Sequence, residues 1–138
     1  MGKHLKSKSK PPIRVLLVDD HAMVRQGLRA ILATYPNFEV VGEASNGEEA
    51  LRSVQRLSPS VVVMDINMPR LNGIEATIKI KQTYPHIVVV GISVNAATEN
   101  QYAMRAAGAT TVISKEAAVD QLYDEIMESV NRRSSAIH

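Results

Sequence analysis

The chain has 138 residues, 45% of them hydrophobic, and a formal net charge of +2. This length suits one domain with a buried core. The absence of cysteine excludes disulfides, thiolate metal sites and thiol nucleophiles, and it is compatible with the cytoplasm, where we expect the protein to act. No apolar run approaches the roughly 20 residues of a membrane span, so no membrane association is expected.

The positive charge is concentrated near the ends of the chain. Residues 1–14 carry five basic residues and no acid. We therefore expect a basic flexible leader at residues 1–12, one domain at residues 13–131 and a short polar tail at residues 132–138. With four Tyr, one Phe and no Trp, the chain has too few aromatic rings to suggest a base-stacking nucleic acid site.

Short apolar runs alternate with amphipathic segments along the domain. The apolar runs predict strands, and apolar residues at helical spacing predict the helices between them. In chain order the prediction is a strand at 13–18, helix 22–34, strand 38–44, helix 50–57, strand 61–64, helix 74–83, strand 87–92, helix 98–107, strand 111–114 and helix 119–130. Asn46-Gly47 predicts a turn before the second helix.

Strict alternation of strands and helices predicts an α/β fold, with a doubly wound parallel sheet covered on both faces. The continuous Val- and Ile-rich strands agree, because strands buried on both sides need no polar alternation. In such sheets ligands bind beyond the carboxyl ends of the strands. The residues that follow each strand are therefore the candidates for function.

Chemically functional side chains follow four of the five predicted strands, namely Asp19 and Asp20, Asp65, Ser93, and Lys115. Three carboxylates in one cleft repel one another, and a hard divalent cation such as Mg²⁺ relieves that repulsion. With an ammonium and a hydroxyl beside them, the carboxylates suit phosphoryl chemistry. Taken singly, each residue has a simpler explanation as a helix cap, a turn residue or a solvated charge. The interpretation therefore depends on all of them meeting at one sheet edge.

The same positions carry a resemblance to a known family. They lie in the motifs at residues 15–20 (VLLVDD), 63–69 (VMDINMP), 72–73 (NG), 91–93 (GIS), 108–109 (GA) and Lys115. In the order and spacing of these motifs, the chain resembles the CheY-like receiver domains of bacterial two-component response regulators from residue 13 to about residue 130. The resemblance implies a flavodoxin-like (βα)5 fold with strand order 2-1-3-4-5. Residues 19–27 and 73–77 are most similar to receivers that precede helix-turn-helix output domains.

The resemblance also implies a role for each of these positions. Asp65 would be the phosphoacceptor, and a histidine kinase or phosphotransfer protein would be the partner that supplies the phosphoryl group. Lys115 would pair with Asp65 and then with the phosphoryl oxygens, toward which Ser93 would move. The implied cofactor is Mg²⁺, with ligands from the side chains of Asp20 and Asp65, from Asp19 through water, and from the backbone carbonyl of Asn67.

Several residues beside these motifs need separate interpretation. Many receivers have Tyr or Phe three residues before the lysine, where this chain has Val112, which we interpret as a plain strand residue. Val94 stands where the family commonly has a smaller residue, and we expect it to narrow access to the phosphoryl group. His21 is interpreted as a surface histidine. Pro69 and Gly73 predict a tight turn after the phosphoacceptor, because Pro lacks an N–H and Gly permits φ > 0.

Two other functions compete with a signalling switch. A metal-dependent phosphatase of the haloacid dehalogenase type would also use Asp65 as nucleophile, but it places a second Asp where this chain has Asn67. A degenerate receiver that only binds proteins would not need the complete set of acids, Ser93 and Lys115. We therefore expect a phosphoacceptor and not a dedicated turnover enzyme.

The sequence does not identify the domain or partner through which such a receiver would pass on its signal. No DNA-binding domain is expected within this chain, which suits a stand-alone receiver, a truncated transcription regulator or the receiver of a hybrid kinase. Dimerisation through the first and last helices is also left open.

Overall fold

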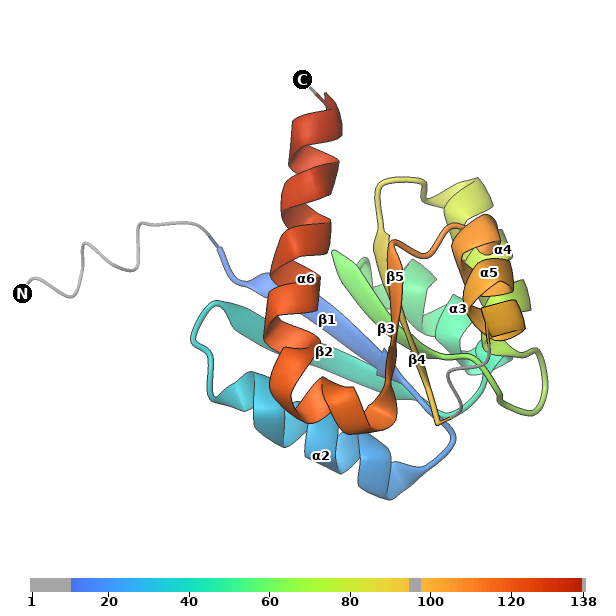
Figure 1. Cartoon of the computed structure of the whole chain (residues 1–138), viewed down its shortest axis with the longest axis horizontal. Coiled ribbons are helices and arrows are strands. Elements are labelled where there is room, and N and C mark those ends of the chain that lie inside the picture. The colour runs from blue at the N-terminus through green and yellow to red at the C-terminus, as the bar shows by residue number, and fades with distance from the viewer. Residues whose placement is uncertain (1–10, 95–97, 138) are drawn as a thin grey trace, which may run out of the picture.

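The computed structural model describes residues 11–94 and 98–137. Residues 1–10 of the expected leader and the last residue of the expected tail lie outside this description. Along the described residues, strands and helices alternate (Figure 1). The strands are β1 (Ile13–Val18), β2 (Phe38–Ala44), β3 (Val61–Asp65), β4 (Val88–Ser93) and β5 (Thr111–Ser114). The helices are α2 (Ala22–Ala33), α3 (Gly47–Leu57), α4 (Gly73–Thr83), α5 (Thr98–Ala107) and α6 (Lys115–Ile137).

The strands form one parallel sheet in the order β2-β1-β3-β4-β5. The predicted α/β class, the doubly wound topology and the strand order are therefore confirmed. Helices α2 and α6 lie on one face of the sheet, and α3, α4 and α5 lie on the other (Figure 1). This arrangement leaves the carboxyl ends of the strands open at one edge.

Each central strand contributes to two hydrophobic cores. Val15 and Leu17 of β1 pack with buried residues of α2 and α6, whereas Leu16 and Val18 pack with those of α3, α4 and α5. All four side chains are fully buried. Burial on both faces explains why these strands are uninterrupted apolar runs, since neither face needs to meet water.

Helix α3 begins earlier than predicted. Asn46 is its N-cap, and the Asn46 side chain accepts a hydrogen bond from the Glu49 backbone N–H at 2.9 Å. The predicted turn at Asn46-Gly47 is therefore a helix N-terminus. Asn is common both in turns and at helix N-caps, because its short side chain can form hydrogen bonds with nearby backbone groups.

Helix α6 extends beyond its predicted limits at both ends. It begins at Lys115, directly after β5, and continues past residue 130, where the apolar spacing ends. Because no loop separates β5 from α6, the first residue of the helix is held at the carboxyl edge of the sheet. Among the helices that the structure describes, none is long and apolar enough to cross a membrane.

Candidate functional site

Three charged side chains meet at the carboxyl edge of β1 and β3. Asp19 follows β1 and Asp65 ends β3, and the two strands are neighbours. Lys115 Nζ lies 2.7 Å from Asp19 Oδ2 and 3.4 Å from Asp65 Oδ2. Asp19 and Asp65 are 0% and 2% exposed, so the single ammonium of Lys115 offsets only part of the charge of two buried carboxylates. The structure thus brings these three predicted site residues together.

The charges of this cluster change one another's protonation. The pKa of Asp65 is raised from 3.8 to about 6, first by burial and then by the negative charge of Asp19, while Lys115 acts in the opposite direction. Burial acts to lower the pKa of Lys115, but its contacts with Asp19 and Asp65 outweigh that effect and raise this pKa. An ionised Asp65 is therefore destabilised by its surroundings, and a further cation at the site would relieve it.

The acids have the spacing and chemistry of a metal site. Asp19, Asp20, His21 and Asp65 each place one candidate ligand atom within 4.8 Å of the others. Asp20 Oδ1 is buried and accepts no hydrogen bond from the described residues, while Asp19 Oδ2 and Asp65 Oδ2, both buried, share the single ammonium of Lys115. Buried carboxylate oxygens are usually hydrogen-bonded. These oxygens therefore fit a hard divalent cation such as Mg²⁺, which prefers oxygen ligands.

The other two predicted site residues lie at the same edge. Ser93 is 1% exposed and ends β4, where its neighbour Ile92 pairs with Asp65 of β3. Asn67 is exposed, and its backbone N–H donates to Asp65 Oδ1 at 3.4 Å. The role assigned to the Asn67 carbonyl stays a prediction.

The loop after Asp65 has an unusual backbone. A Cβ at Gly73 would overlap the Asp65 carbonyl oxygen, so only glycine allows this approach. Gly73 begins α4 without using the positive φ that glycine permits, and the left-handed residues of this loop are Arg70 (φ 53°) and Leu71 (φ 81°). Their carbonyls accept hydrogen bonds from the first turn of α3, which holds this strained conformation beside the site.

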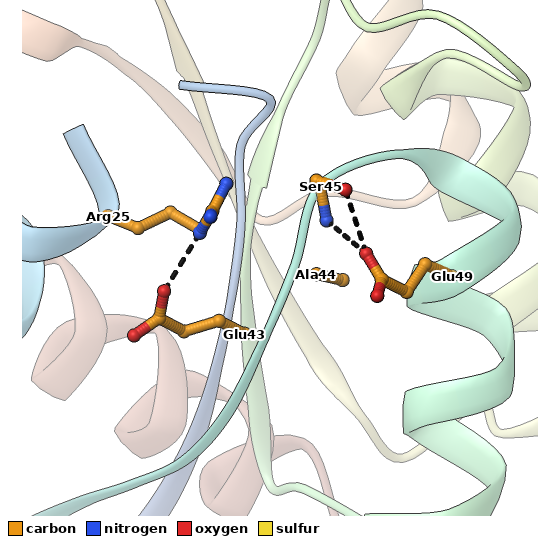
Figure 2. A pocket seen from close by; sticks show the side chains of 5 residues that line it. All are labelled: Arg25, Glu43, Ala44, Ser45 and Glu49. Carbon is orange, nitrogen blue, oxygen red and sulfur yellow. Dashed lines mark hydrogen bonds and ion pairs between the residues drawn. The ribbon is translucent and has the colours of Figure 1, made fainter. Parts of the chain in front are cut away.

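Arg25 of α2 supports the site, although nothing in the sequence identified it as a site residue. Its Nη1 donates to the backbone carbonyl of Asp19, and its Nε donates to Glu43 Oε1 at 2.8 Å. Arg29 donates to Glu43 Oε2, also at 2.8 Å. Figure 2 shows the Arg25–Glu43 pair at the carboxyl end of β2, across a small pocket from Glu49. The four-residue spacing of Arg25 and Arg29 indicates that they lie on one face of the helix, but the sequence alone did not show that Glu43 on β2 would be their acidic partner.

The structure also gives the positions of three residues that we interpreted individually from the sequence. His21 is 64% exposed, as expected of a surface histidine, yet its Nδ1 lies 3.1 Å from Asp20 Oδ1 and 3.3 Å from Asp19 Oδ1. Val112 is buried in the core, which agrees with a plain strand residue. Val94 is 76% exposed directly after β4.

A parallel α/β domain with buried acids and a lysine at the carboxyl edge of its sheet has the organisation of a receiver. The family model of the response regulator receiver domain matches residues 15–127. The chain belongs to this family, and the resemblance inferred from the motifs is confirmed.

Individual relatives agree with this assignment. The chain is 37% identical over 114 residues to the transcriptional regulatory protein DegU of Brevibacillus brevis, covering 83% of this chain and 48% of DegU. It is similar to the response regulator domain of Thermotoga maritima CheB, with a TM-score of 0.81 and 33% identity over 87% of this chain and 97% of that one. It is also similar to a chain of the CheX–CheY–BeF3–Mg²⁺ complex from Borrelia burgdorferi, with a TM-score of 0.81 and 25% identity over 88% of this chain and 92% of that one. The chain spans about half the length of the curated relatives that it matches.

Proposed function

We propose that this receiver domain accepts a phosphoryl group on Asp65 from a histidine kinase or phosphotransfer protein and switches its surface in response. The observation that carries the proposal is the pair of buried carboxylates, Asp19 and Asp65, that share the ammonium of Lys115. With a pKa of about 6, Asp65 is largely ionised at pH 7 and is available as a nucleophile.

The proposed transfer uses a single displacement. A carboxylate oxygen of Asp65 forms a bond to phosphorus, the P–N bond of the donor phosphohistidine breaks, and its electron pair stays on the imidazole nitrogen. The Lys115 ammonium, 3.4 Å from Asp65 Oδ2, neutralises charge on the transferred oxygens. Because Asp65 is already ionised, this side of the reaction needs no base.

We assign Mg²⁺ to the acidic cluster, with ligands from Asp19, Asp20, Asp65 and the backbone carbonyl of Asn67. When bound, the ion supplies charge neutralisation and orientation for the phosphoryl group. Two observations support this assignment: the buried carboxylates, which share one ammonium and include an Asp20 oxygen that accepts no hydrogen bond from the described residues, and the presence of BeF3 and Mg²⁺ in the similar Borrelia burgdorferi complex.

The switch is proposed to act through Ser93. Phosphorylation adds charge and acceptor oxygens beside β4, and the buried Ser93 hydroxyl would turn toward them. Moving a two-state surface from 1:99 to 99:1 needs about 5.5 kcal/mol of differential interaction, whereas one hydrogen bond and one ion pair contribute a few kcal/mol. We therefore expect partial switching. Because Val112 is a core residue, the change is assigned to the segment of residues 108–115 or to the loop after Ser93, of which residues 95–97 lie outside the described residues, rather than to an aromatic side chain.

The output is proposed to require a further domain or a partner protein. This proposal is supported by relatives such as the transcriptional regulatory protein DegU, of which the chain covers 48%. A cytoplasmic location belongs to the same proposal, because the kinase would deliver the phosphoryl group there.

Labelling with radioactive acetyl phosphate tests the proposed function. The expected result is an acid-labile and base-labile adduct that requires Mg²⁺ and is lost in Asp65→Ala. Asp124→Ala, which removes an exposed acid of α6, is the matched control and should label normally. Persistent labelling of Asp65→Ala would contradict the proposal, and rapid turnover of phosphate esters would indicate a phosphatase instead.

A further inference from the structure

His21 faces the acid pair although it is the N-cap of α2. Its ring makes no capping hydrogen bond to the helix. Its Nδ1 lies instead 3.1 Å from Asp20 Oδ1 and 3.3 Å from Asp19 Oδ1. The backbone N–H of His21 also donates to Asp19 Oδ1 at 2.9 Å, which fixes the turn that presents the ring. The ring nitrogen therefore lies beside the carboxylates of the proposed metal site.

The spacing of these atoms matches that of ligands around one ion. Bonds of about 2.1 Å in an octahedral site place neighbouring ligand atoms about 3 Å apart and opposite ones about 4 Å apart. The two His21 distances are close to the first value, and the candidate atoms of Asp19, Asp20, His21 and Asp65 all lie within 4.8 Å of one another. Asp20 Oδ1, the atom closest to the ring, is buried and accepts no hydrogen bond from the described residues. An ion can therefore contact the imidazole and its neighbouring carboxylates once the widest pair of candidate atoms, now within 4.8 Å, closes toward the span of about 4 Å between opposite ligands.

A nitrogen ligand changes which ions a carboxylate site prefers. Carboxylate oxygens suit Mg²⁺ and Ca²⁺, whereas imidazole suits transition ions such as Ni²⁺ and Zn²⁺. We propose that His21 is a metal ligand that raises the affinity of this site for imidazole-binding divalent ions such as Co²⁺ and Ni²⁺ relative to Mg²⁺. This inference rests on the proposed metal site at Asp19, Asp20 and Asp65, and it concerns the selectivity of that site.

A different arrangement would give the same distances. If Nδ1 carried a proton and donated it to the acids, the ring would compete with every cation to a similar degree, and its removal would strengthen the binding of all of them. If the ring is a ligand, its removal weakens only the ions that bind imidazole. The ratio of Co²⁺ to Mg²⁺ affinity separates the two arrangements.

Calorimetric titration of the full chain with Co²⁺ and with Mg²⁺ measures this ratio. His21→Ala should weaken Co²⁺ binding by about tenfold or more and change Mg²⁺ binding less than about twofold, since Mg²⁺ prefers oxygen. His21→Phe keeps the ring shape without its nitrogens and should behave in the same way. The visible absorption of bound Co²⁺ should also change in both variants, because one nitrogen ligand is lost. His86→Ala, which removes an exposed histidine, is the control and should leave both affinities unchanged.

Asp20→Asn separates failure of this inference from failure of the proposed site. If the wild-type chain does not bind Mg²⁺, or if Asp20→Asn does not weaken that binding, the proposed metal site is wrong. If Mg²⁺ binding depends on Asp20 but both His21 variants keep the wild-type ratio of affinities, only the role of His21 is wrong. Equal weakening or equal strengthening of both ions would also overturn that role.

Discussion

Replacing Asp65 by asparagine should stabilise the metal-free domain, and the gain should depend on pH. Below pH 3.8 Asp65 is protonated in both the folded and the unfolded chain, so its titration contributes nothing. Between pH 3.8 and about 6 the unfolded chain loses this proton while the folded chain keeps it, so stability falls as pH rises. Above this window the ionised carboxylate carries its full penalty.

The size of the effect follows from the pKa. A rise from 3.8 to about 6 corresponds to about 3 kcal/mol of lost stability at pH 7 and above. The asparagine side chain does not titrate, so the difference in unfolding free energy between Asp65→Asn and wild type should grow by up to about 3 kcal/mol between pH 4 and pH 7. Any effect of the substitution on packing adds a constant that does not change with pH.

Urea denaturation at several pH values, with a chelator present, measures this difference. Asp124→Asn, which removes an exposed acid of α6, controls for the loss of one charge. Adding Mg²⁺ at about 100 times its Kd should stabilise the wild type by about 2.7 kcal/mol and Asp65→Asn by less, since a ligand is missing. A difference between variant and wild type that stays constant from pH 4 to pH 7 would refute the reasoning.

Other substitutions test neighbouring parts of the site. Lys115→Met removes the cation that holds down the pKa of Asp65, so the pH of half-maximal labelling should move upward; an unchanged pH profile would contradict this role. Gly73→Ala should cost about 3 kcal/mol or more, because its Cβ would meet the Asp65 carbonyl oxygen, whereas Gly27→Ala in open space on α2 should stabilise by about 1 kcal/mol. Similar urea midpoints for the two alanine variants would be inconsistent with the observed packing. Val94→Ala should speed phosphoryl uptake from acetyl phosphate severalfold because it opens the exposed position after Ser93, and equal uptake rates would reject the idea.

The sheet and the convergence of its strand-end residues could be predicted because both follow from local patterns. Apolar runs of strand length indicate strands that are buried on both faces of a sheet, and parallel strands must present their carboxyl ends at one edge of that sheet. Asp19, Asp65 and Lys115 were therefore found without knowledge of any contact. Their distances, and the raised pKa that burial gives Asp65, could not be predicted, because they depend on how closely three separate elements pack.

Other features depend on contacts between residues far apart in the chain. Arg25 required knowledge of Glu43 on a different element. The left-handed backbone at residues 70–71 carries neither Gly nor Asn, the residues that usually mark such positions. It is held instead by α3, so no local pattern indicated it.

Direct mapping of the phosphoryl group tests whether Asp65 is the phosphoacceptor. The chain is treated with acetyl phosphate and Mg²⁺, the product is reduced with borohydride, which converts an aspartyl phosphate to homoserine, and its peptides are sequenced by mass spectrometry. We expect homoserine at position 65 alone, and none when Mg²⁺ is withheld. Homoserine at Asp19 or Asp20, or its absence from position 65 under conditions that label the intact chain, would contradict it.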